Sequence, residues 1–311
     1  MISDRLFPSL LRRWSLLGMG LLTIGFVAMG CDSNGGTPTE ETTVAAIVSS
    51  AQNTTSLADA LEQADLTENL SDEDTTFTVF APVDSAFGNV DAEELTATSD
   101  VLSEVLTYHV VPGAALAADQ IEDGQTVETL EGDSLAFHVD DGTVRVNDAS
   151  LTTTNVEGTN GVVHFIDGVL LETVDAVDHA KLTPRFSIFA DLVAQSDRAT
   201  TLRQEGLTVF APTNQVFLDA LDENDNGEVD DSEVPNNVGA MVQYHALEEV
   251  YSAADVPTSA TDRPTLEGAD VTLQRSDGTV TVNNATVTES DIGVENGVLH
   301  GIDAILSPPS K

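Results

Sequence analysis

The amino-acid sequence predicts an α+β protein in which one domain occurs twice in tandem. Two observations support this fold class. A series of short motifs recurs at an almost constant spacing, and within each copy helical patterns come before strand patterns. Helices followed by strands are typical of α+β folds, whereas alternation of the two would indicate a parallel βαβ sheet. An apolar fraction of 41% supplies enough side chains for folded cores.

The internal repeat is defined by the spacing between matching segments. Thr78–Pro82 (TVFAP) recurs as Thr208–Pro212, an offset of 130 residues, and the Tyr-His pair at 108–109 recurs at 244–245, an offset of 136. The offset then stays at 136 as far as the Ile-Asp pairs at 166 and 302. A register of this kind indicates two copies of one domain. We expect the copies over 43–175 and 180–308, joined by a short connector around 177–181.

Local patterns predict the elements of each copy. Ser56 precedes apolar residues at helical spacing and predicts a capped helix. A second helix is expected over 101–106, leading into the Tyr-His pair. Alternating apolar residues at 77–79 and 144–146 predict strands, and Asp141-Gly142 predicts a hairpin turn beside the second of them.

An acidic insertion distinguishes the second copy. The change of offset from 130 to 136 places six extra residues between Pro212 and Tyr244, and the run 222–233 (DENDNGEVDDSE) lies in that window. We expect a helix starting near Asn214 before it and one ending at His245 after it. The shared fold does not require this run, because the first copy lacks it.

The acidic run matches the pattern D-x-[DN]-x-[DN]-G-x5-E of a calcium-binding loop at every position. Such a loop needs oxygen ligands at positions 1, 3, 5, 7, 9 and 12 and a glycine at position 6. Here position 6 is Gly227, and Glu228 at position 7 would offer its backbone carbonyl. We expect one weakly bound calcium ion, because Pro235 interrupts the exit helix and no second loop is present to pair with it. The predicted ligands are Asp222, Asn224, Asn226, Glu228, Asp230 and Glu233. The alternative is a solvated acidic turn.

The charge balance restricts the partners. The chain has 53 acidic and 11 basic residues, a formal net charge of −42. Such a surface repels the phosphates of nucleic acids and anionic lipids, and its self-repulsion is screened by salt. We therefore expect no nucleic-acid partner, and an exported or salt-adapted protein, typical of a halophile.

The N-terminus predicts export and anchoring. Three arginines precede an apolar run from Trp14 to Met29, which is shorter than the ~20 residues of a spanning helix and ends just before Cys31. This segment, 1–31, resembles a bacterial lipoprotein signal in which the cysteine is lipidated, although position −3 is Ala28. The alternative is an ordinary secretory signal. Cys31 is the only cysteine, so no disulfide can form within the chain. Residues 32–42 are polar and predict a flexible tether.

The repeated motifs resemble those of fasciclin (FAS1) domains. The first motif of that family is found at 78–87 (TVFAPVDSAF) and 208–217 (TVFAPTNQVF), followed in each copy by the Tyr-His pair. The closing motif is found at 160–170 (NGVVHFIDGVL) and 296–306 (NGVLHGIDAIL). The resemblance covers nearly all of the chain after the tether. It implies a twisted β-wedge or sandwich flanked by helices, surface anchoring, and adhesion or matrix binding without catalysis.

Residues that could carry chemistry favour a structural role. The histidines at 109, 164, 245 and 300 lie in apolar runs, where ring nitrogens satisfy buried backbone groups. Asp167 and Asp303 offer only one carboxylate per copy, so a turn or capping role is favoured over acid–base chemistry. No nucleophile elbow, phosphate-binding loop or zinc-protease motif occurs.

These observations favour a non-catalytic, surface-anchored adhesion or matrix-binding protein whose partner is a matrix or cell-surface component. The membrane would be reached through the lipid anchor only. Two other functions are considered. One is a polysaccharide- or small-ligand-binding lipoprotein, disfavoured because aromatic residues are scarce after the signal. The other is a hydrolase, disfavoured by the missing motifs.

Overall fold

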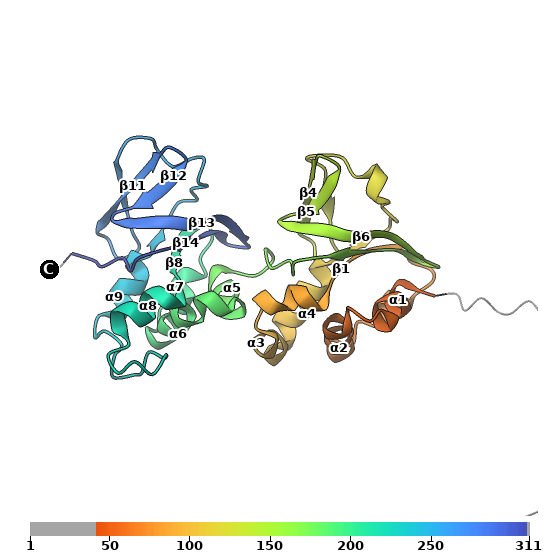
Figure 1. Cartoon of the computed structure of the whole chain (residues 1–311), viewed down its shortest axis with the longest axis horizontal. Coiled ribbons are helices and arrows are strands. Elements are labelled where there is room, and N and C mark those ends of the chain that lie inside the picture. The colour runs from red at the N-terminus through yellow and green to blue at the C-terminus, as the bar shows by residue number, and fades with distance from the viewer. Residues whose placement is uncertain (1–41, 310–311) are drawn as a thin grey trace, which may run out of the picture. The chain divides into compact units, whose positions relative to one another are not determined.

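The computed structural model describes residues 42–309. The segment Glu40–Lys311 forms one compact unit by its internal contacts. The expected signal, the lipidated Cys31 and all but the last residue of the expected tether lie outside the described residues. The two copies predicted from the sequence are present within this unit as two repeats with matching elements (Figure 1).

The first repeat begins with helices and ends with strands, as expected. Its elements are the helices α1 (Val44–Ser50), α2 (Thr55–Gln63), α3 (Ala92–Ala97) and α4 (Ser99–Tyr108), the 3₁₀ turns η1 (Asn69–Ser71), η2 (Asp84–Asn89) and η3 (Ala118–Gln120), and the strands β1 (Phe77–Pro82), β2 (Val110–Pro112), β3 (Thr126–Glu128), β4 (Ser134–Asp140), β5 (Thr143–Val146), β6 (Ala149–Gly158) and β7 (Gly161–Ile166). The expected strand at 77–79, the hairpin at Asp141-Gly142 and the helix before Tyr108 are confirmed. Ser56 as a helix cap is wrong: the helix begins at Thr55, and Ser56 donates its N–H to the Asp84 carboxylate (2.9 Å).

The second repeat has the same order of strands, and its helices match those of the first repeat only in part. Its elements are the helices α5 (Ala176–Leu182), α6 (Ser187–Gln195), α7 (Ala199–Leu202), α8 (Asn214–Leu221) and α9 (Val238–Tyr244), the 3₁₀ turn η4 (Pro184–Phe186), and the strands β8 (Leu207–Pro212), β9 (Ala246–Leu247), β10 (Thr261–Pro264), β11 (Asp270–Ser276), β12 (Thr279–Val282), β13 (Ala285–Val294) and β14 (Gly297–Ile302). The helices expected on either side of the acidic insertion are confirmed as α8 and α9.

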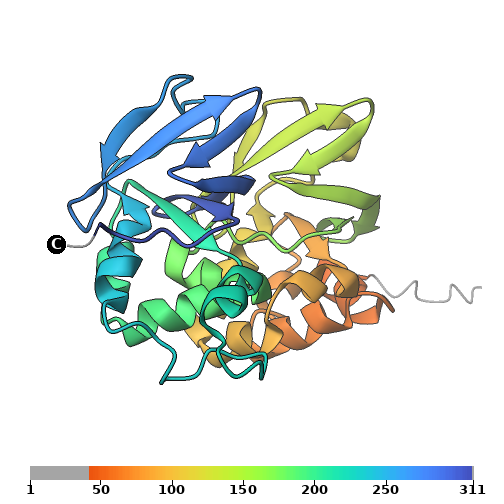
Figure 2. The same ribbon diagram turned by 60° about the vertical axis from the view of Figure 1, so that its left-hand side comes forward.

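Each repeat contains one seven-stranded sheet of the same topology. The strand orders are β2-β1-β7-β6-β5-β4-β3 and β10-β11-β12-β13-β14-β8-β9, which are equivalent when the second is read in reverse. Neighbouring strands are antiparallel except for one parallel pair in each sheet, β1 with β7 and β14 with β8. Figures 1 and 2 show that in each repeat the helices gather at one side of the strands. The fold class is therefore α+β, as predicted.

Each sheet separates two apolar cores, because alternate residues of its central strands point to opposite faces. In the first repeat, Val79 and Val163 face the helical core, whereas Phe80 and Ile166 face a second core closed by Phe137 of β4. The second repeat is built in the same way around Val209 and Phe210. The sheet thus curls over its own second core while helices cover the first, which is the expected wedge flanked by helices.

Residues 177–181, where a short connector is expected, belong to helix α5. Val177 and Ala180 are buried in the helical core of the second repeat. The N–H of Ala176 donates to the Asn296 side-chain oxygen (2.9 Å), as the N–H of Val44 at the start of α1 donates to Asn160 (2.8 Å). Helix α5 is therefore the equivalent of α1, and the expected limits of the two copies, 43–175 and 180–308, stay predictions.

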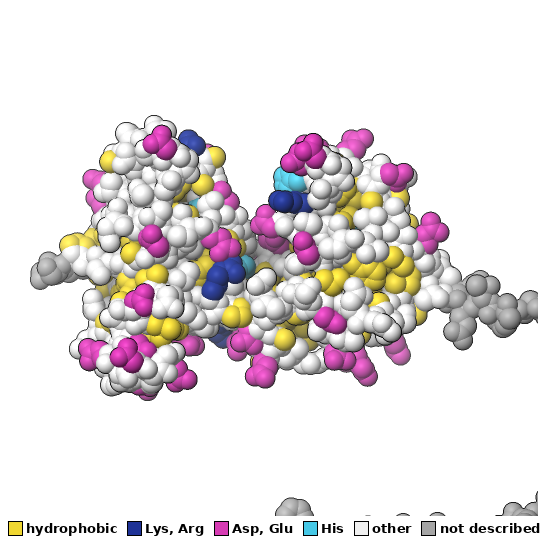
Figure 3. Space-filling view, viewed as in Figure 1, with side chains coloured by type: hydrophobic (Ala, Val, Ile, Leu, Met, Phe, Trp, Pro, Cys, Tyr) yellow, Lys and Arg dark blue, Asp and Glu magenta, His cyan; other side chains and the backbone are white. Residues whose placement is uncertain are grey.

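The described surface is strongly acidic. Figure 3 shows Asp and Glu side chains scattered over the visible face, with few Lys and Arg side chains among them. Several of the cations form ion pairs, including Lys181 with Glu94 (3.1 Å) and Arg203 with Asp178 (2.6 Å). Between residues 42 and 309, no helix is both long and apolar enough to span a bilayer.

Candidate functional site

The acidic insertion is an exposed loop held at one point to the core. Helix α8 ends at Leu221, and Asp222 is its C-cap, with its N–H bonded to the Leu218 carbonyl (3.2 Å). Asp225 and Gly227 have φ angles of 57° and 85°, which turn the chain back sharply. Val229, at position 8 of the loop, packs against the helical core of the second repeat. Figure 1 draws this loop between α8 and α9, and acidic side chains cover the same part of the surface in Figure 3.

The side chains of the predicted calcium ligands converge through hydrogen bonds within the loop. Asp222 accepts from the N–H groups of Gly227 (2.9 Å) and Asn226 (3.2 Å). Glu233 accepts from the N–H groups of Glu223 (2.8 Å) and Asp230 (2.9 Å), so the last position closes the loop onto its first turn. These contacts tie the carboxylates of positions 1 and 12 to backbone N–H groups of the loop.

Two amide side chains bridge the middle of the loop. Asn224 and Asn226 both donate their side-chain N–H groups to Asp230 Oδ2 (2.8 and 3.1 Å). Their oxygens accept backbone N–H groups of Asn226 and Glu228 (3.0 and 2.8 Å). A calcium ion in the loop would need these oxygens to face it, so both amides would have to turn over on binding.

Elsewhere the loop departs from a helix–loop–helix unit. Residues 234–237 are not helical, and α9 begins only at Val238, as expected from Pro235. Among residues 42–309, no group of three or more His, Cys, Asp or Glu side chains is arranged to hold a metal ion. The predicted site depends on amide and carbonyl oxygens for half of its ligands, so the loop stays a prediction and is not a preformed carboxylate cage.

The histidine of each Tyr-His pair is a buried structural residue. His109 Nδ1 lies 2.7 Å from the Val105 carbonyl, and its Nε2 accepts the Leu170 N–H (3.0 Å). His245 repeats both contacts with Met241 (2.8 Å) and Leu306 (3.0 Å). One nitrogen must donate and the other accept, so both rings are neutral. Burial lowers the pKa of each to about 4.

The histidine of each closing motif is also satisfied by backbone groups. His164 Nε2 lies 2.7 Å from the Leu116 carbonyl, and Nδ1 accepts the Asn155 N–H (3.3 Å). His300 does the same with Tyr251 (2.8 Å) and Asp291 (3.1 Å). Desolvation lowers the pKa of both rings. The structural interpretation of the four repeated histidines is confirmed.

The closing motif also holds each repeat together through its aspartate and asparagine. Asp167 and Asp303 each accept one strand N–H, from Ser150 and Thr286, both at 2.6 Å and 17 residues away, so their bonds join distant strands and are not the predicted turn or cap. The buried Asn160 was not singled out from the sequence. Its amide donates to the carbonyls of Leu70 (2.9 Å) and Asp72 (3.0 Å) while its oxygen fixes the start of α1.

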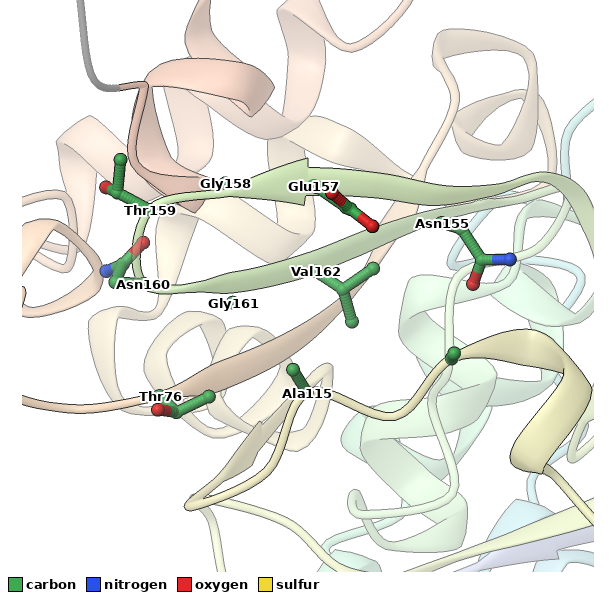
Figure 4. A pocket seen from close by; sticks show the side chains of 10 residues that line it. Thr76, Ala115, Asn155, Glu157, Gly158, Thr159, Asn160, Gly161 and Val162 are labelled. Carbon is green, nitrogen blue, oxygen red and sulfur yellow. The ribbon is translucent and has the colours of Figure 1, made fainter.

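A groove of about 420 Å³ lies beside the β6–β7 hairpin of the first repeat. Figure 4 shows Val162 of β7 and Ala115 of the facing segment pointing into it, with Glu157 and Thr159 at the hairpin. Small side chains leave this space open. The N–H of Leu116 donates to Thr78, and the N–H of Tyr251 donates to Thr208, the equivalent threonine of the second repeat. Val250, which is 49% exposed, is therefore the residue of the second repeat that corresponds to Ala115.

Comparison with known proteins identifies the repeats. The model of the fasciclin domain matches residues 52–172 and 184–308. The chain therefore belongs to the fasciclin family and contains two tandem fasciclin domains.

The relatives include proteins of very different length. Protein sll1483 of Synechocystis sp. is 42% identical over 134 residues, which cover 42% of this chain and 73% of that protein. The rabbit (Oryctolagus cuniculus) transforming growth factor-beta-induced protein ig-h3 and human (Homo sapiens) periostin are both 27% identical over 75% of this chain. The chain covers 35% and 27% of the lengths of these two proteins.

A solved FAS1 domain pair from the insect cell adhesion molecule fasciclin I also matches. The alignment covers 81% of this chain and 97% of that one, with 19% identity and a TM-score of 0.41.

Proposed function

We propose that this protein is a non-catalytic adhesion or matrix-binding protein of the cell surface. The observation that carries this proposal is the pair of fasciclin domains, an arrangement also found in the insect cell adhesion molecule fasciclin I. The repeated histidines and aspartates of this chain make hydrogen bonds to backbone groups and have a structural role. We therefore assign recognition of a partner to the surface of the domains. The partner is a matrix or cell-surface component.

The groove beside the β6–β7 hairpin is our candidate contact surface, because it is open in the first repeat, and the larger Val250 replaces Ala115 at the equivalent position of the second. Binding of the purified chain from residue 32 to immobilised cell-envelope extract, in buffer of high salt, tests this function. Ala115→Tyr should fill the groove and lower binding at least tenfold, whereas Val250→Tyr, at the equivalent position of the second repeat, should have little effect. No saturable binding by the unmodified protein would refute the adhesion function, and equal effects of both variants would refute the groove.

We propose in addition that the second domain binds one calcium ion through the loop 222–233. The full positional match, the left-handed Gly227 and the bond from the Asp230 N–H to Glu233, which joins positions 9 and 12, support it. A cation would also relieve repulsion among carboxylates that are crowded into one turn. The expected affinity is that of extracellular modules, with a Kd of about 10⁻⁴ to 10⁻³ M.

Calorimetry and thermal unfolding with calcium test this site. At a concentration ten times the Kd, calcium should stabilise the second domain by about 1.4 kcal/mol. Glu233→Gln should abolish the binding heat, while Glu73→Gln, which removes an exposed carboxylate of the first domain, should leave it unchanged. Magnesium should compete poorly because it prefers a smaller octahedral site and retains its waters. No heat and no shift at 10 mM calcium, with the protein folded, would mean that the loop is only an acidic turn.

We propose finally that lipid on Cys31 anchors the protein to the outer face of a membrane. The support is the sequence pattern alone, since the cysteine lies outside the described residues. Acyl chains bind membranes by apolar burial, at about 0.8 kcal/mol per buried methylene. Cys31→Ser should release the protein into the medium. A variant that stays with the membrane would mean that the apolar run 14–29 is the anchor instead.

A further inference from the structure

A cavity of about 270 Å³, lined by both polar and apolar residues, lies where the end of the first repeat meets the start of the second. It is lined by side chains from β13, from α5 and η4, and from the segment that follows β7. Gly293 of β13 forms part of the wall, and a Cβ atom there would lie 3.2 Å from Cγ of Glu172. The absence of a side chain at Gly293 therefore makes room for Glu172.

Two orphaned polar atoms lie in this wall. Of all buried side-chain nitrogens and oxygens in the described part of the chain, only Glu172 Oε2 and Arg185 Nε have no hydrogen-bond partner. Both residues line this one cavity. Leaving such a group unpaired costs about 1–3 kcal/mol and more for a charged one, so their coincidence indicates a ligand that satisfies both.

The ligand chemistry follows from what the two atoms need. Glu172 Oε2 requires a donor, and the N–H of Arg185 requires an acceptor. A metal ion could satisfy the carboxylate but could not accept from Arg185. The other charged groups of the lining are Asp148 and Glu289, the latter paired with Arg185 Nη2 (2.6 Å). Three carboxylates against one guanidinium favour a cationic ligand and disfavour a second carboxylate on it.

We propose that this cavity binds a small 2-amino alcohol, whose protonated amine pairs with Glu172 and whose neutral hydroxyl oxygen accepts from Arg185. Free ethanolamine and amino sugars such as D-glucosamine share this chemistry. The proposal stands apart from the adhesion and calcium functions, since no residue of the groove or of the calcium loop takes part.

The occupancy should depend on pH. Burial raises the pKa of Glu172 to about 7, so the carboxylate is mostly ionised at pH 8 and mostly protonated at pH 6. His179, on the α5 wall, has its pKa lowered by burial to about 4 and stays neutral throughout this range. Affinity for ethanolamine, whose amine stays protonated over this range, should therefore fall about tenfold from pH 8 to pH 6.

Calorimetry on the chain from residue 32, at constant ionic strength, tests the site. Ethanolamine and D-glucosamine are compared with ethylammonium, ethylene glycol and N-acetyl-D-glucosamine, which lack the hydroxyl, the amine or the positive charge. We expect the two amino alcohols to bind at pH 8 at least tenfold more tightly than the three controls. If glucosamine binds and ethanolamine does not, the natural ligand is an amino sugar. If ethanolamine binds and glucosamine does not, it is a free amino alcohol.

Variants separate the site from general charge effects. Glu172→Gln should weaken amine binding at least tenfold and remove its pH dependence. Arg185→Lys keeps the charge but lacks Nε, and should lower the advantage of ethanolamine over ethylammonium. Glu104→Gln is the matched control, because its pKa is also raised, to about 7, but it lies outside the cavity lining. The proposal is overturned if no probe binds at 100 mM, if ethylene glycol binds as well as ethanolamine, or if Glu172→Gln binds unchanged.

Discussion

The two repeats make the same connection by different means. Between the first motif and the Tyr-His pair, the first repeat uses η2, α3 and α4, whereas the second uses α8, the acidic loop and α9. In the first repeat Leu95 of α3 is buried in the helical core, and in the second Val229 of the loop is partly buried against the equivalent core. Other apolar side chains of each connection are buried as well, such as Val90 and Leu102 in the first repeat and Phe217 and Met241 in the second.

The difference shows which parts of this domain are fixed. The strands β1 and β8 and the Tyr-His pairs make the same hydrogen bonds in both repeats, for example Phe80 N–H to His109 carbonyl (2.9 Å) and Phe210 N–H to His245 carbonyl (2.8 Å). The stretch between them needs to bridge these fixed ends and to bury apolar side chains against the helical core, which helices or a loop can supply. New chemistry such as a cation loop can therefore be added there at small cost to the fold.

The largest expected effect comes from breaking a feature that both repeats share. A Cβ atom on Gly161 would lie 1.9 Å from the Phe77 carbonyl oxygen, and one on Gly297 would lie 2.0 Å from that of Leu207. Neither strand can move without losing the parallel pairing. Gly161→Ala and Gly297→Ala should each cost more than about 4 kcal/mol in the free energy of unfolding.

Denaturant titration followed by circular dichroism measures this loss. Gly142→Ala and Gly278→Ala are the controls: both glycines have left-handed φ angles (81° and 82°) but open space around them, so each should cost only about 1–2 kcal/mol. If each variant removes half of the folded signal, the repeats unfold separately. Equal, small losses for all four variants would contradict the close approach of the strands.

The sequence predicted the fixed parts well because they are local patterns. Strand alternation at 77–79, the hairpin signal at Asp141-Gly142 and the constant offset each depend on neighbouring residues. The role of Asn160 was missed because its partners, Val44 and Leu70, are 116 and 90 residues away in sequence. Helix α5 was not predicted because its buried face is defined by distant contacts, with Val177 and Ala180 in the core of the second repeat and Leu182 in that of the first.

The calcium loop and the cavity also differ in whether the sequence alone could reveal them. The ligand pattern of the loop is contiguous, so it could be found in the sequence and awaits the calcium measurement. The cavity with Glu172 and Arg185 could not be found, because it combines residues from separate segments and depends on the lack of a side chain at Gly293. Burial, and not sequence context, makes these two residues unusual.

A smaller effect should follow from the buried histidines, equally in both repeats. Because the pKa values of His109 and His245 are about 4 in the folded protein and about 6.5 when unfolded, the unfolded state takes up protons first as the pH falls. The contribution of the neutral rings to the free energy of unfolding is thus fully present above about pH 6.5 and is lost as the pH falls towards 4. Each ring should contribute about 2 kcal/mol of destabilisation between pH 7 and pH 5.

Unfolding free energies of the unmodified protein and of His109→Gln and His245→Gln, measured across this range, check the effect. Each variant should flatten the dependence on pH by a similar amount, whatever its absolute stability. His138→Gln, at a position whose side chain is 63% exposed, is the control. A variant slope equal to that of the unmodified protein would mean that the ring is not buried in its neutral form.

The smallest expected effect concerns the tyrosine of each Tyr-His pair and sharpens the comparison of the repeats. Tyr108 donates its hydroxyl to the Ser134 carbonyl (3.2 Å) and accepts from Asn147 (3.0 Å). Tyr244 donates to the Asp270 carbonyl at a shorter 2.8 Å and accepts from Asn283 (3.1 Å). Phenylalanine keeps the buried ring but leaves the amide donor unpaired, so each substitution should cost about 1 kcal/mol in the free energy of unfolding.

The shorter bond in the second repeat predicts that Tyr244→Phe costs slightly more than Tyr108→Phe. Pairing each with Asn147→Ala or Asn283→Ala in a double-mutant cycle isolates the hydroxyl–amide interaction, and additive losses would show that the hydroxyl does not hold the amide in either repeat.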